Sequence, residues 1–148
     1  MEPISIVVGI CTKMLERVIM TVSPGRGIKV KTTAGAVSYM PGQAIPVVMV
    51  KIFNTGRPQR VDGVHILLSD SGLVIDPMSD NPLPQIVNET QNCKVTFAIN
   101  GIVPKLKELR EHGSTIEPTG IRLRLASGRE IKVQNRGTKR LLRSLLLS

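Results

Sequence analysis

The segment that most constrains the fold is residues 45–53, IPVVMVKIF, in which Lys51 is the only charge. Apolar side chains occupy both alternating sets of positions, so each face of a strand here would be apolar. Such a strand has to be central in its sheet, with other structure covering both sides. The sequence therefore predicts a layered β domain built around this segment.

Turn signals and alternating segments surround this strand. Asn54-Thr55-Gly56, followed by Arg57-Pro58, ends it, since Asn and Gly tolerate positive φ and Pro cannot continue a central strand. Further strands are predicted at 28–33, 61–68, 73–75, 93–99, 121–125 and 131–133, with a bulge at Asp62-Gly63 and a loop over 76–84. The predicted fold is mainly antiparallel β, with about seven to nine strands. Its predicted core includes Val48, Val50, Ile52, Ile66, Val95, Phe97, Leu123 and Leu125.

A short helix is predicted over 104–112, where Pro104 would occupy the first turn and His112-Gly113 the end. Its inward residues would be Leu106 and Leu109, with Val103 as a further candidate. Near the N-terminus, residues 3–15 favour a helix that gives way to a strand near Arg17, and a strand over 16–22 is the competing interpretation.

The length of 148 residues is typical of one domain. We divide it into an apolar or amphipathic segment, 1–22, a β-sandwich domain, 23–134, and a basic amphipathic tail, 135–148. The tail places its leucines on one helical stripe beside Lys139, Arg140 and Arg143. So short a helix forms only against something, which could be the sandwich, a second subunit or an anionic bilayer; a frayed, disordered tail is the alternative.

The formal net charge is +9, which favours nucleic acid, acidic lipid or an acidic protein as partners. General solubility and protection of strand edges are the competing explanations. Scarce aromatic residues argue against stacking on single-stranded nucleic acid. The predicted anionic-partner surface consists of Arg122, Arg124, Lys132, Lys139, Arg140 and Arg143, with Lys94 as a further candidate.

No sequence pattern identifies a reaction, a cofactor or a metal, so we predict that the chain is not an enzyme. Cys11 and Cys93 have no zinc-ligand spacing, and Cys93 fits a buried position. Asp76, Asp80 and Asn81 lack the spacing of a calcium loop. His65 is expected at the surface.

Residues 4–11 are apolar but too short to cross a membrane, and Glu2-Pro3 occupy the place where a secretory signal has basic residues. The expected location is therefore cytoplasmic, with peripheral membrane association through the termini left open.

The segments VVMVKIFNTGRP, CKVTFAI and IRLRLASGREIKV together resemble bacterial and archaeal immunoglobulin-like β-sandwich modules related to cell adhesion. The resemblance covers about residues 45–134 and implies an immunoglobulin-like fold far more than a function. The helical insert at 102–112 and the apolar N-terminal segment depart from the simplest versions. Some proteins of this kind carry a membrane segment before the sandwich.

The primary functional hypothesis is a non-catalytic interaction or structural module that binds another protein or its own copies. A basic nucleic-acid-associated protein is the alternative, and a peripheral membrane-associated protein is the second alternative.

Overall fold

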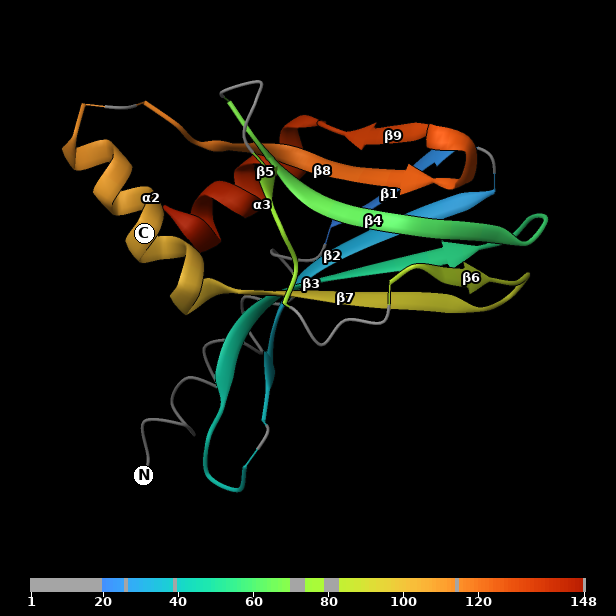
Figure 1. Cartoon of the computed structure of the whole chain (residues 1–148), viewed down its shortest axis with the longest axis horizontal. Helices are drawn as coiled ribbons and strands as arrows, with labels where there is room; N and C mark the ends of the chain where they lie inside the picture. The colour runs from blue at the N-terminus through green and yellow to red at the C-terminus, as the bar shows by residue number, and fades with distance from the viewer. Residues whose placement is uncertain are drawn as a thin grey trace.

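The computed structural model describes residues 20–25, 27–38, 40–69, 74–78, 83–113 and 115–147. Its strands form two antiparallel sheets that face each other (Figure 1). Sheet A has the order β1-β2-β3-β7, made of Met20–Gly25, Ile28–Val37, Ile45–Asn54 and Asn92–Ala98. Sheet B has the order β5-β4-β8-β9, made of Val74–Ile75, Gln59–Leu68, Pro118–Leu125 and Glu130–Val133, and β6 (Gln85–Val87) also pairs with β4. The predicted helix over 3–15 lies outside the described residues, and so do Asp80 and Asn81 of the predicted loop.

The predicted central strand is β3, which lies between β2 and β7. Its alternate residues Val48, Val50 and Ile52 point between the sheets and are almost fully buried. All eight predicted core residues are buried in one cluster, which also contains residues from the two helices formed by the described part of the chain. The prediction of a mainly β fold built around these core residues is therefore confirmed.

The predicted turn at Asn54-Thr55-Gly56 carries the chain from sheet A to sheet B. The Asn54 side-chain amide donates hydrogen bonds to the carbonyls of Val87 and Arg57, each at 2.7 Å. Its Oδ1 accepts a hydrogen bond from Gly56 N at 2.9 Å. Because Asn54 is only 2% exposed, this one side chain satisfies several polar groups away from water.

Gly27, in the β1–β2 connection, approaches this turn closely. It has a φ of +71°, and a Cβ there would lie 2.9 Å from Gly56 N. The predicted bulge is also present, since the pairing of β4 with β8 shifts between Val61 and Gly63. The turn η1 (Ala126–Gly128) joins β8 to β9.

Helix α2 (Ile99–Glu111) differs from its prediction in two ways. It begins at Ile99, directly after β7, so Pro104 lies inside the helix and not at its first turn. Ile102 and Leu106 face the core, whereas Leu109 is 38% exposed. The prediction that Leu109 faces the core is therefore wrong, although Leu109 lines an apolar groove together with Ile102 and Leu106. The predicted end is confirmed, because Gly113 follows His112 with a φ of +86°.

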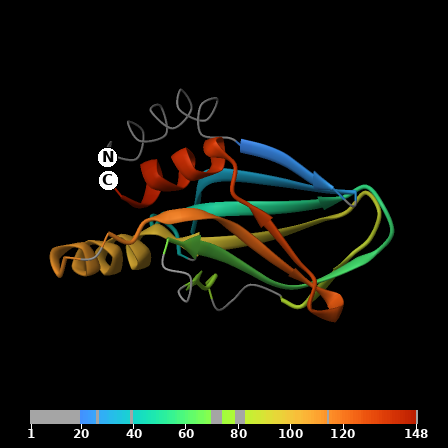
Figure 2. The same ribbon diagram turned by 90° about the horizontal axis from the view of Figure 1, so that it is seen from above.

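Helix α3 (Arg136–Leu146) packs against β8 and also reaches β1, so it contacts both sheets (Figure 2). Leu142 and Leu146 belong to the core between the sheets, and Leu141 is also buried. The tail was expected to form a helix against the domain, a second subunit or a bilayer, and in the structure it packs against the domain. In the described part of the chain, no helix combines the length and apolar character that crossing a membrane requires.

Candidate functional site

Helix α3 exposes four cations along one face. Arg136, Lys139, Arg140 and Arg143 are spaced three, four and seven residues from the first, and together they line a hollow of about 690 Å³. The ridge formed by these four residues, called the α3 ridge below, spans about 10 Å along the helix axis. The leucines on the opposite face are buried, which fixes the direction in which the cations point.

The charges of the α3 ridge are poorly compensated within the fold. The helix contains no acidic residue. Among the described residues, its one ion pair with an acid joins the exposed side chains of Arg143 and Glu117, at 3.4 Å. Such surface pairs contribute little to stability. Arg136 also lies at the helix N-terminus, where the macrodipole disfavours a cation. These uncompensated charges disfavour the helix itself, and an external anion bound to them would offset their repulsion.

The structure divides the six predicted anionic-partner residues between two surfaces. Lys139, Arg140 and Arg143 lie on α3, and Arg122, Arg124 and Lys132 share the outer face of sheet B. Arg122 lies directly opposite both His65 and Lys132, and Arg124 lies opposite Glu130. Lys94 is on β7 in sheet A, so the suggestion that it shares this face is wrong.

The outer face of sheet B is partly neutralised by its own residues. A guanidinium nitrogen of Arg122 lies 3.8 Å from a Glu130 carboxylate oxygen, and another lies 3.2 Å from His65 Nδ1. His65 Nε2 lies 3.3 Å from an Asp76 oxygen. Because a guanidinium can only donate, Nδ1 accepts and the ring proton belongs on Nε2, pointing to Asp76. In this tautomer the ring is neutral, and the charge of Arg122 disfavours its protonation, whereas Asp76 favours it.

His65 is expected to make stability depend on pH. Its side chain is 16% exposed, and burial, followed by the charge of Arg122, lowers its pKa from the ordinary 6.5. Since the unfolded chain then binds more protons, the free energy of unfolding should fall as pH drops through 6.5 toward the lowered value. Urea denaturation between about pH 7.5 and 5.5 measures this. The variant His65→Gln should lose less stability over that interval, and an equal loss in both proteins would contradict the assignment.

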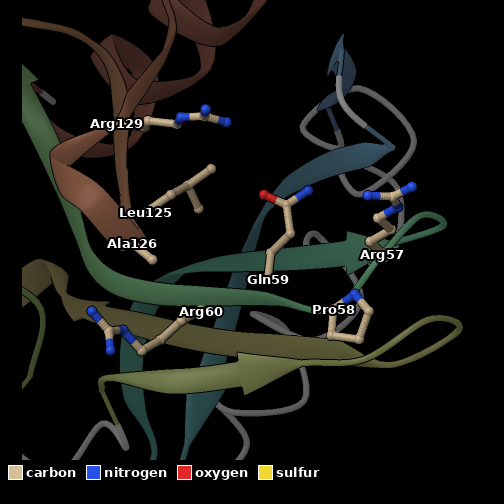
Figure 3. A pocket seen from close by; sticks show the side chains of 7 residues that line it. All are labelled: Arg57, Pro58, Gln59, Arg60, Leu125, Ala126 and Arg129. Atoms are coloured by element: carbon tan, nitrogen blue, oxygen red, sulfur yellow. The ribbon is translucent and has the colours of Figure 1, made fainter.

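Three arginines surround a second hollow, at the end of the sandwich where the chain passes between sheets. It has a volume of about 580 Å³ and is lined by Arg57, Pro58, Gln59, Arg60, Leu125, Ala126 and Arg129. Arg57 and Arg129 approach from opposite sides of Gln59 (Figure 3). Arg60 is paired with Asp62 at 2.6 Å. Sequence reasoning missed this hollow, although Arg57 and Arg129 each directly follow the glycine of a turn.

An apolar groove runs between α2 and the segment that contains β5. It has a volume of about 450 Å³, and Leu68, Ile75, Met78, Ile102 and Leu109 are among its lining residues. The Met78 N–H donates to the Thr96 carbonyl at 3.0 Å, which holds this segment along β7. The lining of the groove is mainly apolar.

The described residues contain no group of three or more His, Cys, Asp or Glu side chains placed to hold a metal ion. Asp76 is exposed. Cys93 is fully buried as predicted, and burial raises the pKa of its thiol, which disfavours the reactive thiolate.

Comparisons with protein-family models, with curated proteins and with solved structures find no match to this chain.

Proposed function

We propose that the chain is a non-catalytic interaction module that binds an anionic macromolecule along the α3 ridge. The observation that carries this proposal is the fixed exposure of Arg136, Lys139 and Arg140 by a helix whose leucines are buried in the domain core. Cations held at fixed spacing lose little freedom when they bind a repeating anion. Arg143 extends the ridge, although Glu117 partly offsets its charge.

The phosphate backbone of nucleic acid is the partner that this geometry favours. Membrane-surface helices bind by burying an apolar face among the lipid chains. The apolar face of α3 is already occupied, since Leu142 and Leu146 are both almost fully buried between the sheets. A backbone of regularly spaced phosphates needs only the cationic face and no particular base sequence.

The triple variant Arg136→Gln, Lys139→Gln and Arg140→Gln, called the α3 variant, tests this proposal. Fluorescence anisotropy with a short labelled DNA duplex should show binding that is about 10-fold weaker at about 50 mM salt. The slope of log affinity against log salt should become shallower by roughly 2 to 3, because three phosphate contacts are lost.

The matched control is Lys105→Gln, Lys107→Gln and Arg110→Gln, called the α2 control variant. It removes the same charge from exposed positions of another helix. Equal loss in the two variants would mean that net charge alone drives binding, and absence of duplex binding by the native chain would overturn the proposal. Light scattering on the same samples measures self-association, and a concentration-dependent oligomer without duplex binding would favour the protein-partner hypothesis.

The fold itself is consistent with an immunoglobulin-like module of the kind that the sequence resembles, and we include that assignment in the proposal. Two features support it: β3 passes to the facing sheet through the Asn54-Thr55-Gly56 turn, and β7 returns to pair beside β3. Helix α2, placed between β7 and β8, is then an insert in such a sandwich.

A further inference from the structure

Three lysines form a row across the outer face of sheet A. Lys31 of β2 lies directly opposite Lys51 of β3, and Lys51 lies directly opposite Lys94 of β7. Neighbouring strands lie about 4.8 Å apart, so the row extends about 10 Å across the sheet. Lys94 is exposed, and Lys31 and Lys51 are half-buried.

The lysine row should destabilise the pairing of the strands in sheet A, because no acidic residue of the sheet compensates its charge. Like charges directly opposite each other in a sheet destabilise the pairing. The four strands of sheet A contain no Asp or Glu, and within the described structure none of the three lysines forms an ion pair. The acid closest in sequence to these strands is Glu89, in the connection before β7. Edge protection does not explain Lys51, because β3 is an inner strand.

An aromatic side chain lies on the same face beside the row. Phe53 is two residues from Lys51 on β3, and side chains two apart in a strand share a face. It lies directly opposite Lys29 on β2 and Asn92 on β7, both of which are exposed. A half-buried phenyl ring is therefore flanked by a cation, an amide and the lysine row.

We propose that this face of sheet A binds single-stranded nucleic acid. The lysine row holds the phosphates, and an unpaired base stacks on Phe53 with Asn92 beside it. Aromatic rings on a cationic surface bind single strands in this way, because every base has a stacking face and a paired base does not expose it. The scarcity of aromatic residues argued against this function, but the fold places one of only two Phe residues where it is needed. This site is separate from the α3 ridge and does not depend on it.

A Phe53→Trp variant provides a direct readout, because the chain contains no Trp. Titration with a short oligothymidine should quench the new fluorescence as a base stacks on the indole. The same titration with inorganic polyphosphate, or with a blunt duplex, should leave the fluorescence nearly unchanged. Quenching by polyphosphate as strong as by the oligothymidine would overturn the proposed stacking.

The triple variant Lys31→Gln, Lys51→Gln and Lys94→Gln, called the sheet A variant, tests the lysine row. Its affinity for labelled oligothymidine should fall about 10-fold at low salt, and its salt slope should fall by about 2. The α2 control variant has the same net charge and should retain most of the affinity. Thermal melting verifies that the sheet A variant is folded, since removing the row should leave the melting temperature unchanged or higher.

The outcomes separate this inference from the proposed function. If the α3 variant loses duplex binding but oligothymidine leaves the indole fluorescence of the Phe53→Trp variant unchanged, this inference fails while the proposed function stands. If oligothymidine quenches that fluorescence and the native chain binds no duplex, the proposed function fails while this inference stands. Equal oligothymidine affinities for the sheet A and α2 control variants would also overturn this inference.

Discussion

Replacing Asn54 by alanine is expected to lower the free energy of unfolding by about 2 to 4 kcal/mol. The substitution removes two donated hydrogen bonds and one accepted bond, all of 2.7–2.9 Å. It also leaves the carbonyl of Val87 without this partner, at a position where the residue is 2% exposed. A buried polar group without a partner costs more than an average hydrogen bond contributes. Urea denaturation at neutral pH measures the change.

Two further substitutions identify the cause. Asn54→Asp keeps the size of the side chain but replaces the amide donor with an acceptor that faces two carbonyls, so it should destabilise at least as much as alanine. Thr55→Ala removes a 3.0 Å bond to the Gly27 carbonyl at an exposed position and should cost less than about 1 kcal/mol. Losses of similar size for Asn54→Ala and Thr55→Ala would show that the buried amide has no special role.

Replacing Leu142 by alanine is expected to destabilise the protein by about 2 to 5 kcal/mol. This side chain is fully buried between the sheets, and its removal leaves a cavity in the shared core. On the same helix, Lys139→Ala changes an exposed residue and should alter stability by no more than about 0.5 kcal/mol. Chemical denaturation with both variants makes the comparison. A small effect of Leu142→Ala would mean that α3 is not part of the cooperative fold.

The packing of α3 also determines how binding experiments have to be designed. Deleting residues 138–148 would remove three of the four cations of the α3 ridge, but it would also remove Leu141, Leu142 and Leu146 from the core. Any loss of binding to lipid or nucleic acid could then follow from unfolding. Charge substitutions at exposed positions avoid this problem, which is why they are used to test both surfaces.

The sequence predicts the sandwich well because its strands have one-sided or two-sided apolar alternation. The eight core residues, the bulge at Asp62-Gly63 and the turn at Asn54 all follow from local pattern and turn chemistry. Helix α2 is less well predicted, since Pro104 is a typical first-turn residue and its position inside the helix has no local signal. The start of that helix depends on where β7 stops pairing with β3, which is a property of the whole sheet.

The candidate surfaces are predicted only in part, because their composition depends on strand order and register. Alternation places Arg122 and Arg124 on an outer face, but it does not say that Lys94 belongs to the other sheet. The lysine row was not predicted for the same reason. Lys31, Lys51 and Lys94 are 20 and 43 residues apart along the chain, and only the pairing of β2, β3 and β7 aligns them.

The contact between α3 and β1 joins the first and last elements of the described chain, so this core is completed only after residues 136–146 have been made. Strands β2 to β9 are all made before residues 136–146, and the gap that Leu142 and Leu146 fill stays open until then. The four cations of α3 acquire their common direction only when α3 packs on the domain. An unfolded chain carries the same formal charge, but it cannot present that charge as an ordered ridge. Binding at α3 would therefore distinguish molecules in which α3 is packed on the domain from those in which it is not.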